Sequence, residues 1–288
     1  MSPPVAEQRA LGVVESASTH ARQGSFRAHA RLITAFTRRN LHARFTATSL
    51  GLVWTLIAPL ATVVIYSTVF AVIFRAGAPD MGSGHSGVFA IFFFVGLVTW
   101  NLFSQGSSQA MMSIVQMGAM LQKVAIPAYV PVFASVLTTV VEKSLEATVM
   151  LVVLAVFGNI GWTWLLYPLA FAATALFACA LGYILAVANV HLRDTAHLYS
   201  ISLQLWFFLT PVMYSISMIP EEWHGLPLRT MLALNPVTQF VVIARDLLYL
   251  LQLPSLGSVL YALGCLVVAC LAAVLVHRRW GQDVSEAL

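Results

Sequence analysis

Long apolar runs separated by short polar or charged segments dominate the chain. Six of these runs approach or exceed the roughly 20 residues that an α-helix needs to cross the hydrocarbon core of a bilayer. They are Leu52–Phe74, Val88–Phe103, Tyr129–Phe157, Trp164–Val190, Leu198–Ile216 and Leu256–Val276. The pattern predicts an all-α integral membrane protein whose six transmembrane helices occupy residues 51–279, between tails at 1–26 and 280–288. We expect the first tail to be disordered, because it is polar and shows no periodicity.

Residues 27–50 carry a helical pattern of a different kind. One half of the helical wheel holds Leu32, Ile33, Phe36 and Leu41, and the other half holds Arg27, Arg31, Arg38, Arg39 and His42. Arg44 and Phe45 do not fit this division. Beside a membrane, such a helix lies in the interface with its apolar face in lipid and its arginines among anionic head groups. The sequence therefore predicts an amphipathic interface helix before the first span.

The fifth apolar run loses its regularity at Thr210 and Pro211. Two amphipathic segments follow, Ser217–Trp223 and Leu232–Tyr249, and neither is long and apolar enough to cross a bilayer. We expect them to form a re-entrant helical hairpin between the fifth and sixth spans. Non-helical backbone at membrane depth is tolerated only where protein buries it or where it borders a wet cavity. A transport pathway is therefore expected here.

Composition and charge support a membrane location. Of the 288 residues, 59% are hydrophobic and 9% are charged, with a net charge of +4, whereas soluble domains carry about 25% charged residues. With both termini in the cytoplasm, basic residues gather inside, namely Arg9, Arg22, Arg27, Arg31, Arg38, Arg39, Arg44, Lys123, Arg193, Arg278 and Arg279. Only Arg75, Arg229 and Arg245 fall outside. This positive-inside pattern predicts an even number of crossings, and it argues against a basic face that binds nucleic acid.

Three charged residues lie inside the third predicted span. Glu142 and Glu146 are one helical turn apart, and Lys143 reaches Glu146 at a spacing of three residues. Charges at membrane depth are costly and mark either a buried ion pair or an aqueous path. A structural ion-pair network, proton or ion coupling, and contact with a substrate path all remain open.

The chain contains no pattern typical of catalysis or nucleotide binding. It has no G-x-x-x-x-G-K-[ST] loop to hold nucleotide phosphates. His191, Asp194 and His197 match no zinc signature, and Cys179, Cys265 and Cys270 lie inside predicted spans as packing residues. We therefore expect no catalytic residue, metal site or cofactor in this chain.

Several motifs resemble, in sequence order, the permease subunits of ATP-binding-cassette polysaccharide exporters, a type-2 permease family. The similarity spans residues 32–288. The motifs are Leu50-Gly51-Leu52-Val53-Trp54 with Pro59, Gly96-Leu97-Val98-Thr99-Trp100-Asn101-Leu102-Phe103-Ser104, Leu121-Gln122-Lys123-Val124-Ala125-Ile126-Pro127, Asn189-Val190-His191-Leu192-Arg193-Asp194, Leu205-Trp206-Phe207-Phe208-Leu209-Thr210-Pro211-Val212-Met213-Tyr214 and Leu234-Asn235-Pro236-Val237-Thr238.

The resemblance implies a homodimer that works with two ATPase subunits, which bind ATP and Mg²⁺. The complex would export a lipid-linked polysaccharide, of the O-antigen, teichoic acid or cell-wall galactan class, across the bacterial cytoplasmic membrane. By the same resemblance, the contacts with the ATPase involve Arg38, Arg39, Gln122, Lys123, His191, Arg193 and Asp194.

Aromatic side chains are the expected lining of the substrate channel. Sugar rings present C–H faces that pack on aromatic rings, so a channel that lets a glycan slide needs large flat side chains. The candidates come from the second and fifth spans and are Phe93, Trp100, Tyr199, Trp206, Phe207 and Tyr214. Two other functions remain open, a type-2 permease for drugs or lipids and a polytopic membrane transferase.

Overall fold

A computed structural model of the protein describes residues 26–46, 53–73, 75, 77–118, 126–222 and 225–281. The regular elements in these residues are all helices, which confirms the all-α prediction. In chain order they are α2 (Phe26–Thr46), α3 (Val53–Ser67), the π-helix η1 (Thr68–Ile73), α4 (Phe89–Gln116), α6 (Tyr129–Val156), the 3₁₀-helix η2 (Trp162–Leu166), α7 (Tyr167–His191), α8 (Thr195–Leu209), the 3₁₀-helix η3 (Ile216–Met218), α9 (Leu228–Ala233), α10 (Pro236–Leu248) and α11 (Leu256–Trp280).

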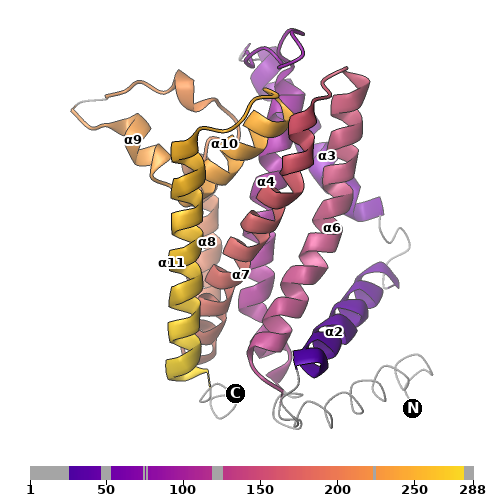
Figure 1. Ribbon diagram of the computed structural model, residues 1–288, viewed down its shortest axis with the longest axis vertical. Coiled ribbons are helices and arrows are strands. Elements are labelled where there is room, and N and C mark those ends of the chain that lie inside the picture. Colours follow the sequence, from indigo (N-terminus) through magenta and orange to yellow (C-terminus); the bar gives the residue numbers. More distant parts are fainter. Residues whose placement is uncertain are drawn as a thin grey trace.

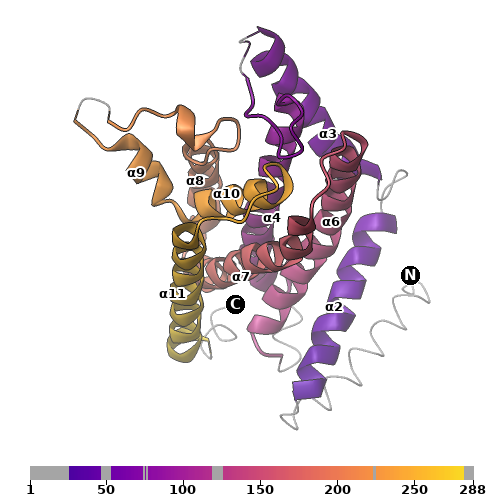
Figure 2. The same cartoon turned by 45° about the horizontal axis from the view of Figure 1, so that its top comes forward.

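The long helices form a bundle in which successive helices alternate in direction. In Figure 1, α4, α7 and α11 run downward while α6 and α8 run upward. The loop 77–88, α9 and α10 lie near the upper end, and the connection between α7 and α8 lies at the lower end. α2 is set apart from this alternation and lies along α6 at the edge of the bundle (Figure 2).

Close packing of α4 against α7 holds the centre of the bundle together. A Cβ atom on Gly182 of α7 would lie 2.4 Å from Cβ of Ala110 on α4, and one on Gly106 would lie 3.2 Å from Cβ of Ala178. Lipid tails are as apolar as leucine side chains, so helices in a bilayer associate through such close approach of small residues. These glycines therefore let α4 serve as the central helix.

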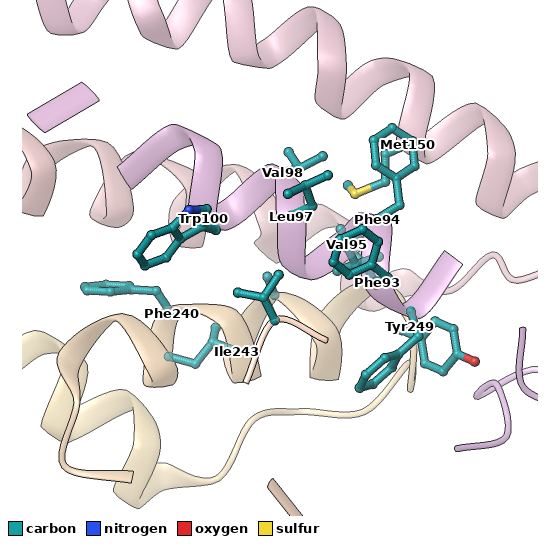
Figure 3. Close-up of a cluster of buried hydrophobic side chains, with 14 of the residues drawn as sticks. Phe93, Phe94, Val95, Leu97, Val98, Trp100, Met150, Phe240, Ile243 and Tyr249 are labelled. Atoms are coloured by element: carbon teal, nitrogen blue, oxygen red, sulfur yellow. The ribbon is translucent and has the colours of Figure 1, made fainter. Parts of the chain in front are cut away.

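A buried cluster at the upper half of α4 joins this helix to α6 and α10 (Figure 3). Phe93, Phe94, Val95, Leu97, Val98 and Trp100 of α4 meet Met150 of α6, together with Phe240, Ile243 and Tyr249 in and after α10. This cluster fixes α10 against α4, although α10 is too short to span a bilayer.

Four helical segments of the described residues are long and apolar enough to cross a membrane. They are Leu56–Ile73, Phe89–Gln116, Trp162–His191 and Leu256–Trp280. α6 has 28 residues, but every stretch of 18 within it contains all three of Glu142, Lys143 and Glu146. α8 has only 15 residues, because the chain turns at Thr210 and Pro211. The chain is thus a multi-pass helical membrane protein, with α6 and α8 as its two less typical helices.

Two boundaries differ from those expected. The second span does not end at Phe103, because α4 continues unbroken to Gln116. Ser104, Gln105, Ser108 and Gln109, which follow Phe103, lie on one face of this helix, while Ala110 and Ile114 on other faces stay buried. The expected fifth span to Ile216 is also shorter, since α8 ends at Leu209.

Two of the four residues on the apolar face of α2 pack on protein rather than in lipid, and the placement of this helix in the membrane interface stays a prediction. Leu32 and Phe36 are fully buried in a cluster with Val130, Val132 and other residues of α6 and α7. α2 therefore belongs to the folded bundle, with Arg27, Arg31 and Arg38 exposed on its outer side.

Candidate functional site

A groove of about 600 Å³ runs between α4 and α8, with one contribution from α3. Its walls consist of aromatic rings, hydroxyl groups and primary amides. They are Tyr66 of α3, Trp100, Ser104, Gln105, Ser108 and Gln109 of α4, and Leu203, Gln204, Phe207 and Phe208 of α8. We call this feature the α4–α8 groove.

The helical repeat explains why one wall is polar. Trp100, Ser104 and Ser108 follow one another at intervals of four residues, so they lie on one face of α4. Gln105 and Gln109 extend the same stripe. Polar side chains inside a transmembrane segment normally face protein or a wet cavity, because lipid offers them no hydrogen-bond partner. The stripe is therefore consistent with a water-accessible groove.

The aromatic side chains of the groove are held in place by contacts with one another. The ring centroids of Trp100 and Phe207 lie 5.5 Å apart with an interplanar angle of 60°. Those of Tyr66 and Phe207 lie 6.4 Å apart in an edge-to-face arrangement. Such a surface presents flat apolar faces next to amide donors and acceptors. It suits a ligand that has both C–H faces and hydroxyl groups.

Two of the six aromatic residues expected to line a channel, Trp100 and Phe207, lie in the groove. Phe93 is instead fully buried in the core. The hydroxyl groups of Tyr199 and Ser107 are 2.7 Å apart and hydrogen-bonded inside the bundle. Trp206 donates its indole N–H to Oδ1 of Asn235 at 2.8 Å.

Tyr214, the last of the six, donates its hydroxyl to the carbonyl of Phe208 at 2.9 Å. The groove also contains residues that the sequence did not single out as channel residues. These are Tyr66, Ser104, Gln105, Ser108, Gln109, Leu203, Gln204 and Phe208. The available signal was the polar stripe on α4, because the same face points toward α8.

The charged residues of α6 take part in two separate ion pairs. Nζ of Lys143 lies 2.7 Å from Oε2 of Glu146, and both side chains are buried. The other carboxylate oxygen of Glu146 accepts a hydrogen bond from Nδ2 of Asn101 at 3.0 Å. Glu142 pairs with Arg44 of α2, whose Nη1 lies 2.6 Å from Oε2. Of the three roles left open by the sequence, these contacts match a structural ion-pair network.

The residues expected to contact an ATPase lie in two described regions. On α2, Arg38 is exposed, and the guanidinium of Arg39 lies 4.9 Å from the ring centroid of Phe36. Partial burial lowers the pKa of Arg39 from its ordinary value, because desolvation disfavours the charged form. His191, Arg193 and Asp194 are exposed where α7 meets α8. Gln122 and Lys123 lie outside the described residues.

No cluster suited to metal binding occurs in the part of the chain that the structure describes. There, no three side chains of His, Cys, Asp or Glu come close enough together to hold a metal ion.

Comparisons with known proteins show which family the sequence matches. A family model described as ABC-2 type transporter matches residues 31–249. The chain is 32% identical over 260 residues to the O-antigen export system permease protein RfbA of Myxococcus xanthus. The aligned region covers 89% of this chain and 95% of that protein. The chain is 24% identical over 219 residues to the protein of the same name from Klebsiella pneumoniae, covering 75% and 79% of the two chains.

Proposed function

Because the chain belongs to the ABC-2 type transporter family, we propose that it is the membrane subunit of an ATP-driven polysaccharide exporter. The substrate is a lipid-linked glycan of the O-antigen, teichoic acid or cell-wall galactan class, and the membrane is the bacterial cytoplasmic membrane. The names of the curated relatives support the polysaccharide assignment. This subunit binds and moves the substrate and performs no chemical step.

The α4–α8 groove is the observation that carries this proposal. Trp100 and Phe207 offer ring faces on which the C–H face of a sugar packs. Gln105, Gln109 and Gln204 offer amide groups that exchange hydrogen bonds with sugar hydroxyls. Weak, non-directional stacking with neutral hydrogen bonds allows a polymer to slide, whereas strong ionic contacts would hold it in one place.

A second polypeptide must supply the energy, because this chain has no loop that holds nucleotide phosphates. We assign that role to an ATP-binding-cassette ATPase, present in two copies, which binds ATP and Mg²⁺. It would dock on the face formed by Arg38 and Arg39 of α2, by Gln122 and Lys123, and by His191, Arg193 and Asp194. Two copies of this chain would complete the assembly as a homodimer.

The proposed topology has six crossings with both termini in the cytoplasm. α6 and α8 act as the third and fifth crossings, since α6 buries its charged residues in ion pairs. The expected re-entrant hairpin of Ser217–Trp223 and Leu232–Tyr249 lies near the outer surface, and α10 falls within its second segment. The alternating helix directions in Figure 1 support an even number of crossings.

Depletion of the protein in its native host tests this function. The expected result is that surface polysaccharide falls while the lipid-linked glycan accumulates inside the cell. Complementation with the wild-type gene should reverse both changes, and complementation should fail when the partner ATPase lacks its phosphate-loop lysine. Unchanged surface polysaccharide, with altered sensitivity to drugs or altered lipid content instead, would favour a drug or lipid permease.

A further inference from the structure

A buried arginine that has no carboxylate partner among the described residues lies at the outer end of the bundle. Arg245 of α10 is 4% exposed. The ion pairs in the described part of the chain do not include it. The neighbouring carboxylate of Asp246 accepts instead from Nε2 of Gln252 at 2.9 Å. A buried charge needs strong compensation, so the groups that surround Arg245 show what it does.

Backbone carbonyls surround the guanidinium of Arg245. Nη1 donates to the carbonyls of Pro211 and Tyr214, and Nη2 donates to that of Val212. These three carbonyls belong to the turn that follows α8, where the chain is no longer helical. Backbone groups of such a turn must find partners when protein or lipid surrounds them. Arg245 therefore replaces the hydrogen bonds that the end of α8 loses.

The opposite side of the guanidinium lies against α4. Nε donates to the carbonyl of Phe92 at 3.4 Å, and Cζ lies 3.6 Å from the centroid of the Phe92 ring. Gly96 leaves room for this arrangement, since a Cβ atom there would lie 2.7 Å from Nη2 of Arg245. Arg245 thus bridges α10, the turn after α8 and the central helix α4.

A second contact joins the other end of α10 to α8. Asn235, which caps the start of α10, accepts the indole N–H of Trp206 at 2.8 Å. Its Nδ2 donates to Oγ1 of Thr210 at 3.0 Å. The side chain of Asn235 therefore binds the last turn of α8, and Arg245 binds the residues that follow.

The end of α10 is itself fixed to the outer loops. Nδ2 of Asn159 donates to the carbonyls of Leu248 and Tyr249, at 2.8 and 3.0 Å. Oγ1 of Thr163 donates to the carbonyl of Leu247 at 2.6 Å. α10 is thus a rigid support, and α8 is attached to it at two points.

We propose that Arg245 and Asn235 are positioning residues that set the width of the α4–α8 groove. Phe207 and Phe208, two of the four residues of its α8 wall, lie in the last turn of α8, just before the turn that Arg245 holds. A shift of this turn would move that wall relative to Trp100 on α4. The consequence for transport rests on the proposed function, namely that a glycan occupies this groove.

Arginine suits this role better than lysine. Its planar guanidinium presents five N–H donors in a fixed arrangement, whereas an ammonium group is a compact charge with three donors. Four carbonyl acceptors on two sides of the group, with an aromatic face beside it, match the guanidinium. We therefore expect Arg245→Lys to release the turn even though it keeps the charge.

Thiol reactivity in the groove tests the proposal without reference to transport. Ser104→Cys is introduced into the full-length chain after Cys179, Cys265 and Cys270 are replaced by serine. The purified protein, with its ATPase partner where this co-purifies, reacts with one small and one bulky methanethiosulfonate reagent. The ratio of the two rates reports the width of the groove, because a wider groove admits the bulky reagent more readily.

The expected result is a change of about fivefold in this ratio for Arg245→Lys, Arg245→Met and Gly96→Ala. Gly264→Ala is the matched control, because a Cβ atom at this α11 position meets no atom within 4 Å. The effect of Gly96→Ala should be largely lost when Arg245 is already methionine, because the added methyl group acts mainly on Nη2 of Arg245, at 2.7 Å, and only secondarily on the carbonyl oxygen of Val212, at 3.2 Å. This loss of effect distinguishes positioning by Arg245 from a general packing defect.

Two outcomes would overturn the proposal. One is an unchanged ratio in Gly96→Ala and Arg245→Lys protein that accumulates and purifies normally. The other is an effect of Gly96→Ala that is the same with methionine at position 245. If the ratio changes as expected but the wild-type complex exports no glycan, the positioning role stands and the proposed function fails.

Discussion

Arg44 of α2 and Glu142 of α6 form an ion pair in which the guanidinium contacts both carboxylate oxygens through Nη1, at 2.8 and 2.6 Å. Arg44 is the residue that did not fit the two faces of the amphipathic helix. The packing of α6 against α2 explains the position of Arg44, because its side chain extends to the buried carboxylate of Glu142. The exposed fractions of the two side chains differ, at 38% for Arg44 and 6% for Glu142.

This difference predicts unequal costs for removing either partner. Arg44→Ala should destabilise the protein by about 3 kcal/mol, because it leaves the carboxylate of Glu142 buried without its cation. Glu142→Gln should cost only about 1 kcal/mol, because Arg44 can extend its charged end toward water. Thermal unfolding of the purified chain in detergent measures both values. Arg38→Ala on the exposed side of α2 is the control, and equal costs for the two variants would contradict this account.

The groove makes a prediction about export. Phe207→Ala should reduce export of the native glycan about fivefold, because an aromatic contact of this kind is worth about 1 kcal/mol. Gln109→Ala should act in the same direction through the loss of hydrogen bonds. Leu263→Ala, which removes a similar volume from the exposed face of α11, should have no effect. Surface polysaccharide at equal protein levels is the measurement, and normal export by both groove variants would remove the groove from the pathway.

The proposed topology predicts which positions react with a membrane-impermeant thiol reagent in intact cells. Single cysteines at His85, Ile160 and Glu222 should be labelled from outside, and a cysteine at Arg193 should be labelled only after the cells are opened. Ile160 is 64% exposed and is a better choice than Gly161, where a Cβ atom would lie 2.9 Å from the side chain of Leu251. Labelling of Arg193→Cys in intact cells would contradict both cytoplasmic termini and six crossings.

Charge reversal at the connection between α7 and α8 tests the contact with the ATPase. Arg193→Glu and Asp194→Lys change exposed side chains, so they should leave the thermal stability of the chain within about 0.5 kcal/mol of the wild-type value. Co-purification of the ATPase, or its stimulation by this chain, should fall. Arg75→Glu, at the other end of the bundle, is the matched control. Normal co-purification and normal export of both variants would remove this connection from the interface.

The sequence predicted where the helices lie along the chain better than it predicted how they pack against one another. Long apolar runs identified α3, α4, α7 and α11, and Pro211 correctly marked the interruption of the fifth run. The extension of α4 to Gln116 was missed because Ser104 to Gln109 looked like the end of a span. Only the packing of α8 shows that Ser104, Gln105, Ser108 and Gln109 line a groove.

The sequence did not show whether an individual aromatic side chain points into the core or into the groove. Phe93 and Phe207 both come from aromatic runs, yet one is buried between α4 and its neighbours and the other faces the groove. Which side of a helix is covered depends on tertiary packing. The role of Arg245 could not be predicted either. Its partners are backbone carbonyls, and every residue has one, so the amino-acid sequence does not distinguish them.

Transport into inverted membrane vesicles tests the central claim most directly. Vesicles that contain this chain and its ATPase are supplied with the radiolabelled lipid-linked glycan on their outer face, which corresponds to the cytoplasm. The account predicts uptake that needs ATP and both proteins, so that the polymer becomes protected from added glycosidase. Glycan that stays fully accessible to the enzyme, in vesicles where the complex hydrolyses ATP, would contradict the claim.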